Sequence, residues 1–296
     1  MSVNNKALRG EYSEQTPLLR YNSWRVGGMA ERLYKPYDCA DLSDFLKNLA
    51  PAEPLTWLGL GSNVLIRDGG IKGTVIITQG RLDGLAAVDA VTVRAEAGVS
   101  CAKVARFCAK LGLTGVEFLA GVPGTIGGAL AMNAGAFGSE TWDYVSSVET
   151  MDRQGATHQR LPKDYELGYR SVKAPAEEWF IAAYFKCERG DAQTSINTIN
   201  DFLKRRAATQ PTNEPSCGSV FRNPPKDFAA RLIEACALKG TRKGDACVSE
   251  KHANFIVNKG AATAADIEAL IEEVAATVYA KQQVKLIKEV KILGEP

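Results

Sequence analysis

The chain has 296 residues, with 36 Lys and Arg against 34 Asp and Glu and a hydrophobic content of 45%. This length allows about two domains with a sizeable core. A net charge of +2, with no block of like charges, argues against a nucleic-acid partner. The polar amino-terminal stretch MSVNNKALRGEYSEQ lacks the zones of a signal peptide, and no apolar run is long enough to span a membrane. We therefore expect a cytoplasmic protein with no membrane insertion.

The first third of the chain predicts one small α+β lobe. Strand-like segments occur at 32–36, 55–63, 64–70 and 73–78, and an amphipathic helix is predicted at 40–49. The next section predicts a second α+β lobe with a strand at 91–98, a helix at 101–113, strands at 146–152 and 179–187, and a helix near 195–207.

The pattern changes after the proline-marked segment 209–215. A helix is predicted at 227–238, a strand at 252–258, a long helix from about 264 and a last strand at 285–293. The long helix has apolar residues at helical spacing, and Thr263 with Asp266 resembles a capping box at its start.

The seven cysteines are spread along the chain without a C-x-x-C pair, and only two histidines, His158 and His252, are present. An odd number without metal-site spacing is typical of reduced thiols. We expect these thiols to be mostly buried and expect no metal site.

The stretch AGVPGTIGGALAMNAGAFG at 120–138 is rich in glycine and carries no charge, so it resembles neither a solvated linker nor a core helix. A second glycine segment, LGLGSNVL, lies at 58–65. Bare backbone of this kind lets N–H groups approach an anion such as phosphate, although such glycines also serve simply to form tight turns.

Two common nucleotide motifs can be excluded. LGLGSNVL lacks the third glycine of a Rossmann fingerprint and leads into another strand, and the stretch 120–138 has no lysine for a P-loop. Two phosphate-compatible backbones remain, with Asn63, Thr125 and Asn133 as uncharged hydrogen-bond partners. Two uncharged segments of this kind suit a flavin dinucleotide better than a tightly held nicotinamide dinucleotide, because most contacts would come from neutral backbone donors rather than from an acidic residue on the ribose.

Seven motifs in chain order carry a family resemblance. They are NSWRVGG from Asn22, LGLGSNVL from Leu58, AGVPGTIGGA from Ala120, MNAGAFG from Met132, GYRS from Gly168, PSCGSVFRNP from Pro215 and EVKILGE from Glu289. Together they resemble the UDP-N-acetylenolpyruvoylglucosamine reductase (MurB) family from about Tyr21 to Glu295. The short connection from Tyr169 to Trp179 resembles the shorter subtype, which lacks an extra tyrosine-bearing loop.

The chain departs from the common family pattern at three positions. Serine stands at 23 where threonine is frequent, Leu60 stands where glycine often occurs, and Ala237 stands where glycine is usual. None of the three touches the chemistry that the resemblance implies, although Ala237 could adjust the path of Lys239.

The resemblance implies an α+β fold with a two-lobed FAD-binding domain of the PCMH (vanillyl-alcohol-oxidase-like) type and a carboxy-terminal α+β substrate-binding domain. We expect the FAD-binding domain at 22–207, with lobes at about 22–86 and 87–207. The substrate-binding domain is expected at 208–296, with the last strand, 286–293, returning to the first lobe so that Glu289 faces the flavin.

The resemblance also implies a reaction in peptidoglycan precursor synthesis, and so a role in cell wall biogenesis, cell shape and cell division. NADPH, the co-substrate, reduces FAD. Hydride then passes to C3 of the enolpyruvyl group of UDP-N-acetylglucosamine enolpyruvate, and a proton reaches C2 to give UDP-N-acetylmuramate. No histidine or cysteine lies in the glycine-rich segments, so the FAD is expected to be noncovalent. We expect a monomer.

Three catalytic residues follow from the matching motifs. Arg170 in GYRS is implied to stabilise the enolate-like charge, since a guanidinium stays cationic and grips carboxylates. Glu289 is implied to polarise the substrate with it, as a protonated acid if its pKa is raised. Ser219 is implied to protonate C2, and only the family register separates it from Ser216. A serine hydrolase is disfavoured because SCGSV does not match G-x-S-x-G.

The binding residues are expected in the same motifs. The predicted cofactor contacts are Gly59, Gly61, Ser62, Asn63, Val64, Leu65, Gly121, Val122, Pro123, Gly124, Thr125, Gly127, Gly128, Asn133, Gly135 and Ala136. The predicted substrate contacts are Arg222, Asn223, Lys239, Lys251 and His252, although lysines are commonly just solvated and His252 suits a structural role better than a catalytic one.

Two other functions remain open on the sequence. One is a different PCMH-type flavoenzyme, such as an alcohol or lactone oxidase that uses oxygen. The other is a nonenzymatic protein that binds FAD or a UDP-sugar. A dehydrogenating oxidase would not need the combination of Arg170, Ser219 and Glu289, and in a binding protein these residues would be idle.

Overall fold

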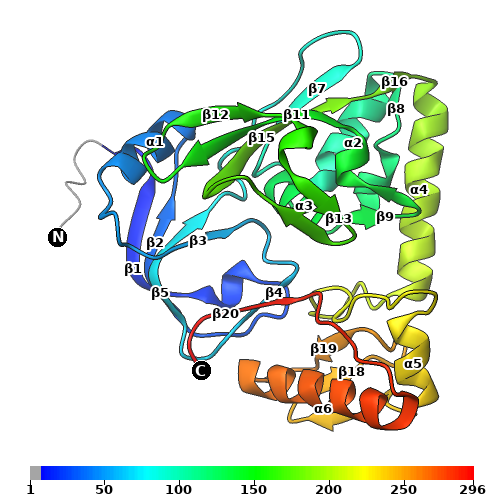
Figure 1. Ribbon diagram of the computed structural model, residues 1–296. Coiled ribbons are helices and arrows are strands. Elements are labelled where there is room, and N and C mark those ends of the chain that lie inside the picture. The colour runs from blue at the N-terminus through cyan, green and yellow to red at the C-terminus, as the bar shows by residue number, and fades with distance from the viewer. Residues whose placement is uncertain (1–7) are drawn as a thin grey trace. The chain divides into compact units, whose positions relative to one another are not determined.

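The computed structural model describes residues 8–296, and the chain forms two compact units (Figure 1). The first unit contains Arg32–Leu60 and Gly73–Lys204 with the described residues up to Ser13. The second contains Glu14–Glu31, Gly61–Lys72 and Arg205–Pro296. Two early segments thus group with the carboxy-terminal part, and the functional domain boundaries stay a prediction. Residues 1–7, which include the start of the stretch examined for a signal peptide, lie outside the described residues.

The first sheet has the strand order β1 (Glu11–Pro17), β2 (Met29–Lys35), β5 (Ile71–Ile77) and β3 (Leu55–Leu58). Helix α1 (Cys39–Lys47) begins at Asp38, whose side chain accepts a hydrogen bond from the Asp41 amide. Phe45 of this helix stacks on Tyr34 of β2, with 3.8 Å between ring centroids. The predicted helix and strands are confirmed here, whereas β1 was missed because this mostly exposed strand has no apolar alternation.

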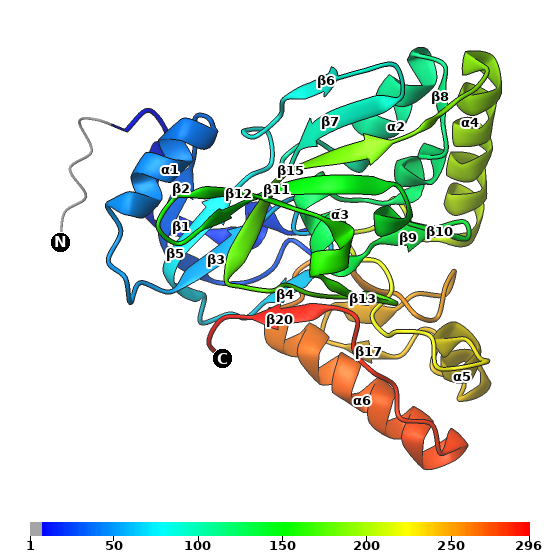
Figure 2. The same ribbon diagram turned by 45° about the horizontal axis from the view of Figure 1, so that its top comes forward.

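The second sheet has the strand order β12 (Thr157–Arg160), β11 (Val145–Asp152), β15 (Glu178–Lys186), β7 (Thr92–Glu96) and β6 (Leu85–Ala87). Its register places Val148 opposite Ala183 and Ala183 opposite Ala95, so one face carries a row of apolar side chains. That face packs in one core cluster with α2 (Cys101–Lys110), α3 (Ile126–Met132) and α4 (Ala192–Thr209) (Figure 2). The strands and the two helices predicted for this lobe are confirmed, and α3 was not predicted.

Short elements complete the first unit and the start of the second. The hairpins and bridges are β9 (Gly135–Ala136) with β10 (Ser139–Glu140), β13 (Glu166–Gly168) with β14 (Ser171–Lys173), and β8 (Leu113–Thr114) with β16 (Glu188–Arg189). In the part of the chain that the structure describes, four 3-10 helices occur: η1 (Leu18–Tyr21), η2 (Glu117–Gly121), η3 (Thr141–Asp143) and η4 (Pro162–Asp164). Elements this short carry almost no periodic signal, so the sequence did not predict them.

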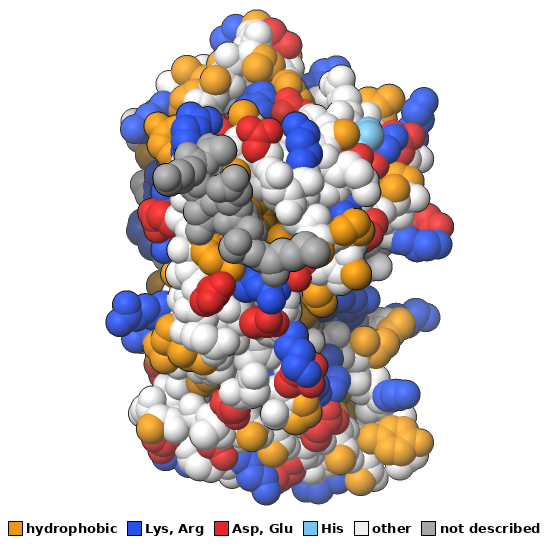
Figure 3. Space-filling model, turned by 90° about the vertical axis from the view of Figure 1, so that its left-hand side faces the viewer, with side chains coloured by type: hydrophobic (Ala, Val, Ile, Leu, Met, Phe, Trp, Pro, Cys, Tyr) orange, Lys and Arg blue, Asp and Glu red, His pale blue; other side chains and the backbone are white. Residues whose placement is uncertain are grey.

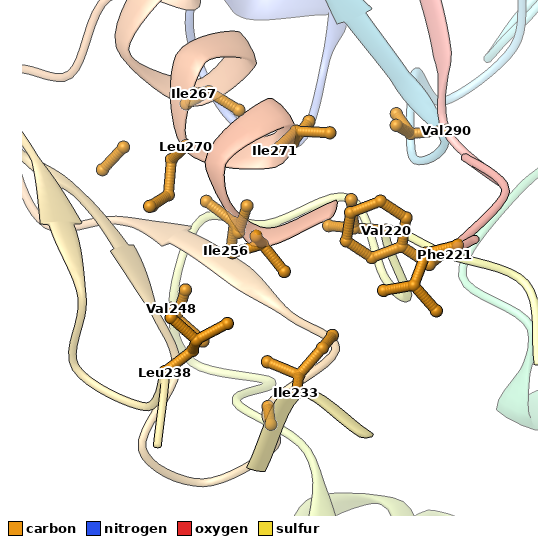
Figure 4. Close-up of a cluster of buried hydrophobic side chains, with 14 of the residues drawn as sticks. Val220, Phe221, Ile233, Leu238, Val248, Ile256, Ile267, Leu270, Ile271 and Val290 are labelled. Carbon is orange, nitrogen blue, oxygen red and sulfur yellow. The ribbon is translucent and has the colours of Figure 1, made fainter. Parts of the chain in front are cut away.

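The core of the second unit forms around α6 (Ala264–Gln282), which packs against α5 (Ala229–Ala235), β17 (Arg242–Lys243), β18 (Ala246–Val248) and β19 (Ile256–Asn258). The predicted apolar face of α6 is buried, as Figure 4 shows for Ile267, Leu270 and Ile271. The capping box is confirmed, because Thr263 and Asp266 each accept from the other's amide at 3.0 Å. The Asp68 carboxylate accepts from two further amides of the first turn, those of Ala264 and Ala265.

The last strand, β20 (Lys291–Leu293), pairs in parallel with β4 (Val64–Ile66) in the second unit. It is shorter than the predicted strand at 285–293. The residues before it follow another path, since Phe221 and Lys288 form an isolated antiparallel bridge. The carboxy-terminal segment therefore contacts both the glycine loop near 63 and the segment near 220.

The charge pattern agrees with the low net charge. On the face in Figure 3, Lys and Arg side chains are interspersed with Asp and Glu side chains, and no extended area of one sign appears. Within residues 8–296 no helix combines the length and apolarity needed to cross a membrane.

The seven cysteines are free, as predicted. Six are buried and Cys39 is half-buried. Burial raises the pKa of the Cys101 and Cys217 thiols to about 12, so both remain protonated at neutral pH.

Helix α5 ends in a Schellman motif with alanine at the left-handed position. Ala237 has φ of 59°, its amide donates to Glu234 O at 2.9 Å, and the Leu238 amide donates to Ile233 O at 3.4 Å. Glycine is favoured at this position because it has no Cβ. Ala237→Gly should therefore raise the free energy of unfolding by about 0.5–1 kcal/mol, measured by urea denaturation. A decrease would show that the left-handed alanine is not strained.

Candidate active site

The glycine-rich stretch contains more regular structure than the sequence predicted. Residues Ile126–Met132 form α3, so the prediction that this stretch does not resemble a core helix was wrong. The buried residues Ile126, Ala129 and Leu130 have helical spacing and pack in the core. This burial outweighs the helix-propensity cost of Gly127 and Gly128, about 1 kcal/mol each.

A small polar cradle lies between Gly59 and Thr125 in the first unit. The Thr125 side chain is buried, and among the described residues its Oγ1 finds no hydrogen-bond partner. A Cβ added at Gly59 would collide with this Oγ1, so only glycine fits opposite it. A buried hydroxyl without a partner costs free energy, and this cost is removed when a ligand oxygen or N–H group binds there. The unpartnered Thr125 hydroxyl, at a predicted cofactor contact, therefore fits a polar group of a cofactor.

Thr125→Val tests this cradle by removing the hydroxyl while keeping the branched shape. We expect FAD to bind roughly 10-fold more weakly because a hydrogen bond to a charged group is lost. The apoprotein should become more stable by about 1 kcal/mol, since a buried unsatisfied group disappears. Flavin fluorescence on release and denaturation of the apoprotein measure the two effects. Unchanged FAD affinity together with a less stable apoprotein would contradict the role.

Two other predicted cofactor glycines have packing reasons of their own. A Cβ at Gly121 would strike the Phe137 ring, and one at Gly127 would lie 3.0 Å from the Ala97 Cβ. The Gly127 amide also donates to Ala97 O at 2.9 Å. Gly127 thus lets the loop dock beside Ala97, and Gly121 leaves space for the Phe137 ring. The contact of both glycines with a cofactor stays a prediction.

Arg170 stands at a strained position in the β13–β14 turn. Gly168 pairs with Ser171, so Tyr169 and Arg170 form the turn, and Arg170 has φ of 53°. A left-handed conformation costs a side-chain-bearing residue about 1–2 kcal/mol. Strain of this kind is typical of functional positions. The Arg170 guanidinium also lies over the Tyr169 ring, 4.9 Å from its centroid.

The guanidinium of Arg170 is held by the segment that follows α3. Its Nη1 donates to Asn133 O at 3.1 Å and its Nη2 to Gly135 O at 2.8 Å, and Nη1 lies 3.4 Å from Glu140 Oε1. Residues predicted from two separate motifs are thus brought together, Asn133 and Gly135 from MNAGAFG and Arg170 from GYRS. Glu140 was missed, although it ends the motif-bearing run MNAGAFGSE and its charge was the only one in that run.

Ser219 and Glu289 are brought together in the second unit. The Glu289 amide donates to the carbonyl of Val220, the residue after Ser219, at 2.8 Å. Asn254 fixes the same segment, because its carbonyl accepts from the Val220 amide and its side chain bonds both backbone groups of Phe221. Gly218 has φ of 72°, and within residues 8–296 no heavy atom beyond Gly218 and its two chain neighbours lies within 4 Å of the place where its Cβ would be. Ser219 therefore follows a turn with open space beside it.

The glycine loop in LGLGSNVL is hydrogen-bonded to the segment that carries Glu289. The Asn63 side chain donates to Glu289 O at 3.2 Å, and the Lys291 amide donates to Asn63 O at 3.0 Å. On the other side, the Cys217 thiol lies 3.2 Å from Val64 O. The second unit thus assembles a predicted cofactor loop with two of the three predicted catalytic residues.

The other predicted cofactor residues are divided between the units. Gly61, Ser62, Val64 and Leu65 lie in the second unit, whereas Gly59 and all those from 121 to 136 lie in the first. Arg170 likewise belongs to the first unit and Ser219 and Glu289 to the second. The convergence of these three residues on one substrate stays a prediction.

The predicted substrate contacts all lie in the second unit and have partners within it. Lys239 pairs with Glu234 at 2.6 Å, Lys251 Nζ donates to Ala207 O, and Asn223 Oδ1 accepts from the Ala229 amide at the start of α5. The Arg222 amide donates to Ile287 O at 2.9 Å. Burial lowers the pKa of His252, and its Nδ1 accepts from the Asn254 amide at 3.3 Å. Their roles in substrate binding stay predictions.

Two family models match the sequence. The model described as an FAD binding domain matches residues 30–159, and the model of the UDP-N-acetylenolpyruvoylglucosamine reductase carboxy-terminal domain matches residues 210–293. The chain is therefore an α+β flavoprotein with an FAD-binding domain followed by a second domain, which confirms the expected fold class.

Several relatives that cover nearly all of this chain are named UDP-N-acetylenolpyruvoylglucosamine reductases. A UDP-N-acetylenolpyruvoylglucosamine reductase of Alkalilimnicola ehrlichii is 57% identical over 100% of this chain and 99% of its own length. One of Methylococcus capsulatus is 59% identical over 97% of this chain and 94% of its own length. The crystal structure of MurB from Thermus caldophilus matches with a TM-score of 0.80 and 30% identity, covering 97% of this chain and 100% of that one. The chain belongs to the UDP-N-acetylenolpyruvoylglucosamine reductase family.

Proposed function

We propose that this chain uses NADPH and noncovalent FAD to reduce the enolpyruvyl group of UDP-N-acetylglucosamine enolpyruvate to UDP-N-acetylmuramate. We further propose that it acts as a monomer in the cytoplasm. One observation carries the proposal: Asn63 of the glycine loop bonds Glu289, and Glu289 bonds the backbone beside Ser219. A loop suited to a cofactor and two groups suited to the reduction thus lie together in one unit.

FAD, when bound, would supply hydride chemistry for C3 of the enolpyruvyl group. Gly59 and Thr125 would hold the cofactor, because the bare backbone of Gly59 lets the Thr125 side chain lie close to the glycine loop and Thr125 offers a buried hydroxyl without a partner among the described residues. Addition at C3 places negative charge on C2 and the adjacent carboxylate. Arg170 would bind that carboxylate and stabilise charge that exists only late in the step, which accelerates the reaction rather than only tightening binding.

Ser219 would deliver its hydroxyl proton to C2, which completes the addition of hydride and proton across the double bond. A hydroxyl is a weak acid, so it must be held within hydrogen-bond reach of the carbon. The bonds of Val220 to Asn254 and to Glu289 fix the backbone next to Ser219 for this purpose. Glu289 would polarise the substrate from the neighbouring segment, just before β20.

Anaerobic spectroscopy of the purified protein tests the function. NADPH should bleach the yellow flavin, and UDP-N-acetylglucosamine enolpyruvate should then restore the colour rapidly. Flavin that stays bleached after this addition would refute the proposal.

The same experiment separates the alternatives. An oxidase would recover its colour with oxygen and ignore the enolpyruvyl substrate. A binding protein would show no substrate-dependent recovery, even if it contained flavin. Sedimentation velocity would test the monomer.

A further inference from the structure

We propose that Glu140 is a positioning residue for Arg170, which deepens and rests on the proposed function. The carboxylate of Glu140 would orient the guanidinium toward the substrate carboxylate without touching the substrate. The proposal concerns the first unit alone, where Arg170, Glu140 and the segment Asn133–Gly135 form one network.

The network holds the guanidinium with three oxygens from one short segment. Two are the carbonyl oxygens of Asn133 and Gly135, and the third is Glu140 Oε1. A Cβ at Gly135 would lie 3.1 Å from Arg170 Nη1, so the guanidinium packs against bare backbone. Only 16% of the Arg170 side chain is exposed, and these contacts therefore restrict it strongly.

Glu140 also fixes the turn that presents these carbonyls. Its Oε2 accepts from Asn133 Nδ2 at 2.7 Å, and Asn133 caps α3 in the left-handed conformation with φ of 42°. The Asn133 side chain also donates to Gly168 O at 3.3 Å, just before the turn that carries Arg170. The Glu140 carboxylate thus bonds the Asn133 side chain, which in turn bonds the backbone just before the turn of Arg170.

The distances suit a supporting role. The bond from Asn133 to Glu140 is 2.7 Å, whereas the contact from Arg170 to Glu140 is 3.4 Å, so the carboxylate bonds most strongly to the turn and holds the arginine mainly by charge. A long side chain that is ordered before the substrate arrives loses less entropy on binding it. We infer that Glu140 provides this preorganisation.

A double-mutant cycle tests the inference. Glu140→Gln should slow substrate-dependent flavin reoxidation by roughly 10- to 100-fold, because misplacing a catalytic group by about 1 Å has effects of this size. Reduction of the flavin by NADPH should stay within about twofold. In the Arg170→Ala background, Glu140→Gln should have almost no further effect, since its role depends on the arginine. Equal effects in both backgrounds would overturn the proposal.

A matched control and a second measurement complete the test. Glu166→Gln removes a carboxylate of the same β13–β14 hairpin that pairs with exposed Lys173, and it should change neither half-reaction. Nitrogen-15 NMR of the Arg170 guanidinium should show faster rotation of the group in Glu140→Gln. Should that variant fail to fold, Glu140→Asp is measured in the same way.

The NMR measurement needs no substrate, so the two proposals fail separately. If the wild-type protein does not reduce the enolpyruvyl substrate, the proposed function falls. If the guanidinium rotates equally fast with and without the Glu140 carboxylate, the positioning role falls whatever the activity.

Discussion

Ser219→Ala should reduce the flavin with NADPH at nearly the wild-type rate and then fail to pass the reducing equivalents to the enolpyruvyl substrate. The substitution removes the proton donor and little else, because the Ser219 backbone stays fixed by the bonds of Val220 to Asn254 and Glu289. General acid catalysis is worth about 10²- to 10⁴-fold, and we expect the second half-reaction to slow by that factor.

Stopped-flow absorbance measures the two halves separately, and Ser216→Ala provides the matched control. Ser216 lies on the same segment, at a similar half-buried exposure, so its loss should leave both rates within a factor of about two. If Ser219→Ala slowed both halves equally, Ser219 would be a structural residue of the segment. If Ser216→Ala abolished the second half instead, the family register chosen for the proton donor would be wrong.

The sequence predicted elements whose signals are local. The apolar spacing of Ile267, Leu270 and Ile271 and the box of Thr263 with Asp266 predict α6 and its start, and burial follows that pattern. Helix α3 was missed because its glycines oppose a helix locally, while its stability comes from packing of Ile126 and Leu130 in a core that a local pattern does not reveal.

The candidate site also depends on contacts that a local sequence pattern does not reveal, here between residues far apart in the chain. Glycine segments and motif order indicated a cofactor protein, but the bond from Asn63 to Glu289 joins residues 226 positions apart. The single charge of Glu140 at the end of MNAGAFGSE does not by itself reveal its partners, because these depend on where Asn133 turns the chain and where Arg170 returns to it. Hydrogen-bond partners that lie far apart in the sequence are set by the topology of the fold. A local sequence pattern does not reveal them, because they become neighbours only when the strands have paired.

Arg170→Lys should cost the second half-reaction about 10²- to 10³-fold even though the positive charge is kept. Two guanidinium nitrogens of Arg170 bond two different carbonyl oxygens, those of Asn133 and Gly135. A single ammonium group cannot make this planar pair of bonds and also bind a substrate carboxylate with two parallel ones. The loss should appear in the rate constant for substrate-dependent reoxidation, with NADPH-dependent reduction unchanged.

The control for this prediction is Arg189→Lys on the exposed strand β16, which removes a solvent-exposed guanidinium from the same unit. It should change neither rate. If Arg170→Lys were equally harmless, charge alone would suffice at this position, and the strained turn at Arg170 would need another explanation. The variant could instead raise only the KM for the enolpyruvyl substrate. Arg170 would then bind the ground state and the transition state equally strongly. Stabilisation of the developing charge would in that case have to come from Glu289 and Ser219.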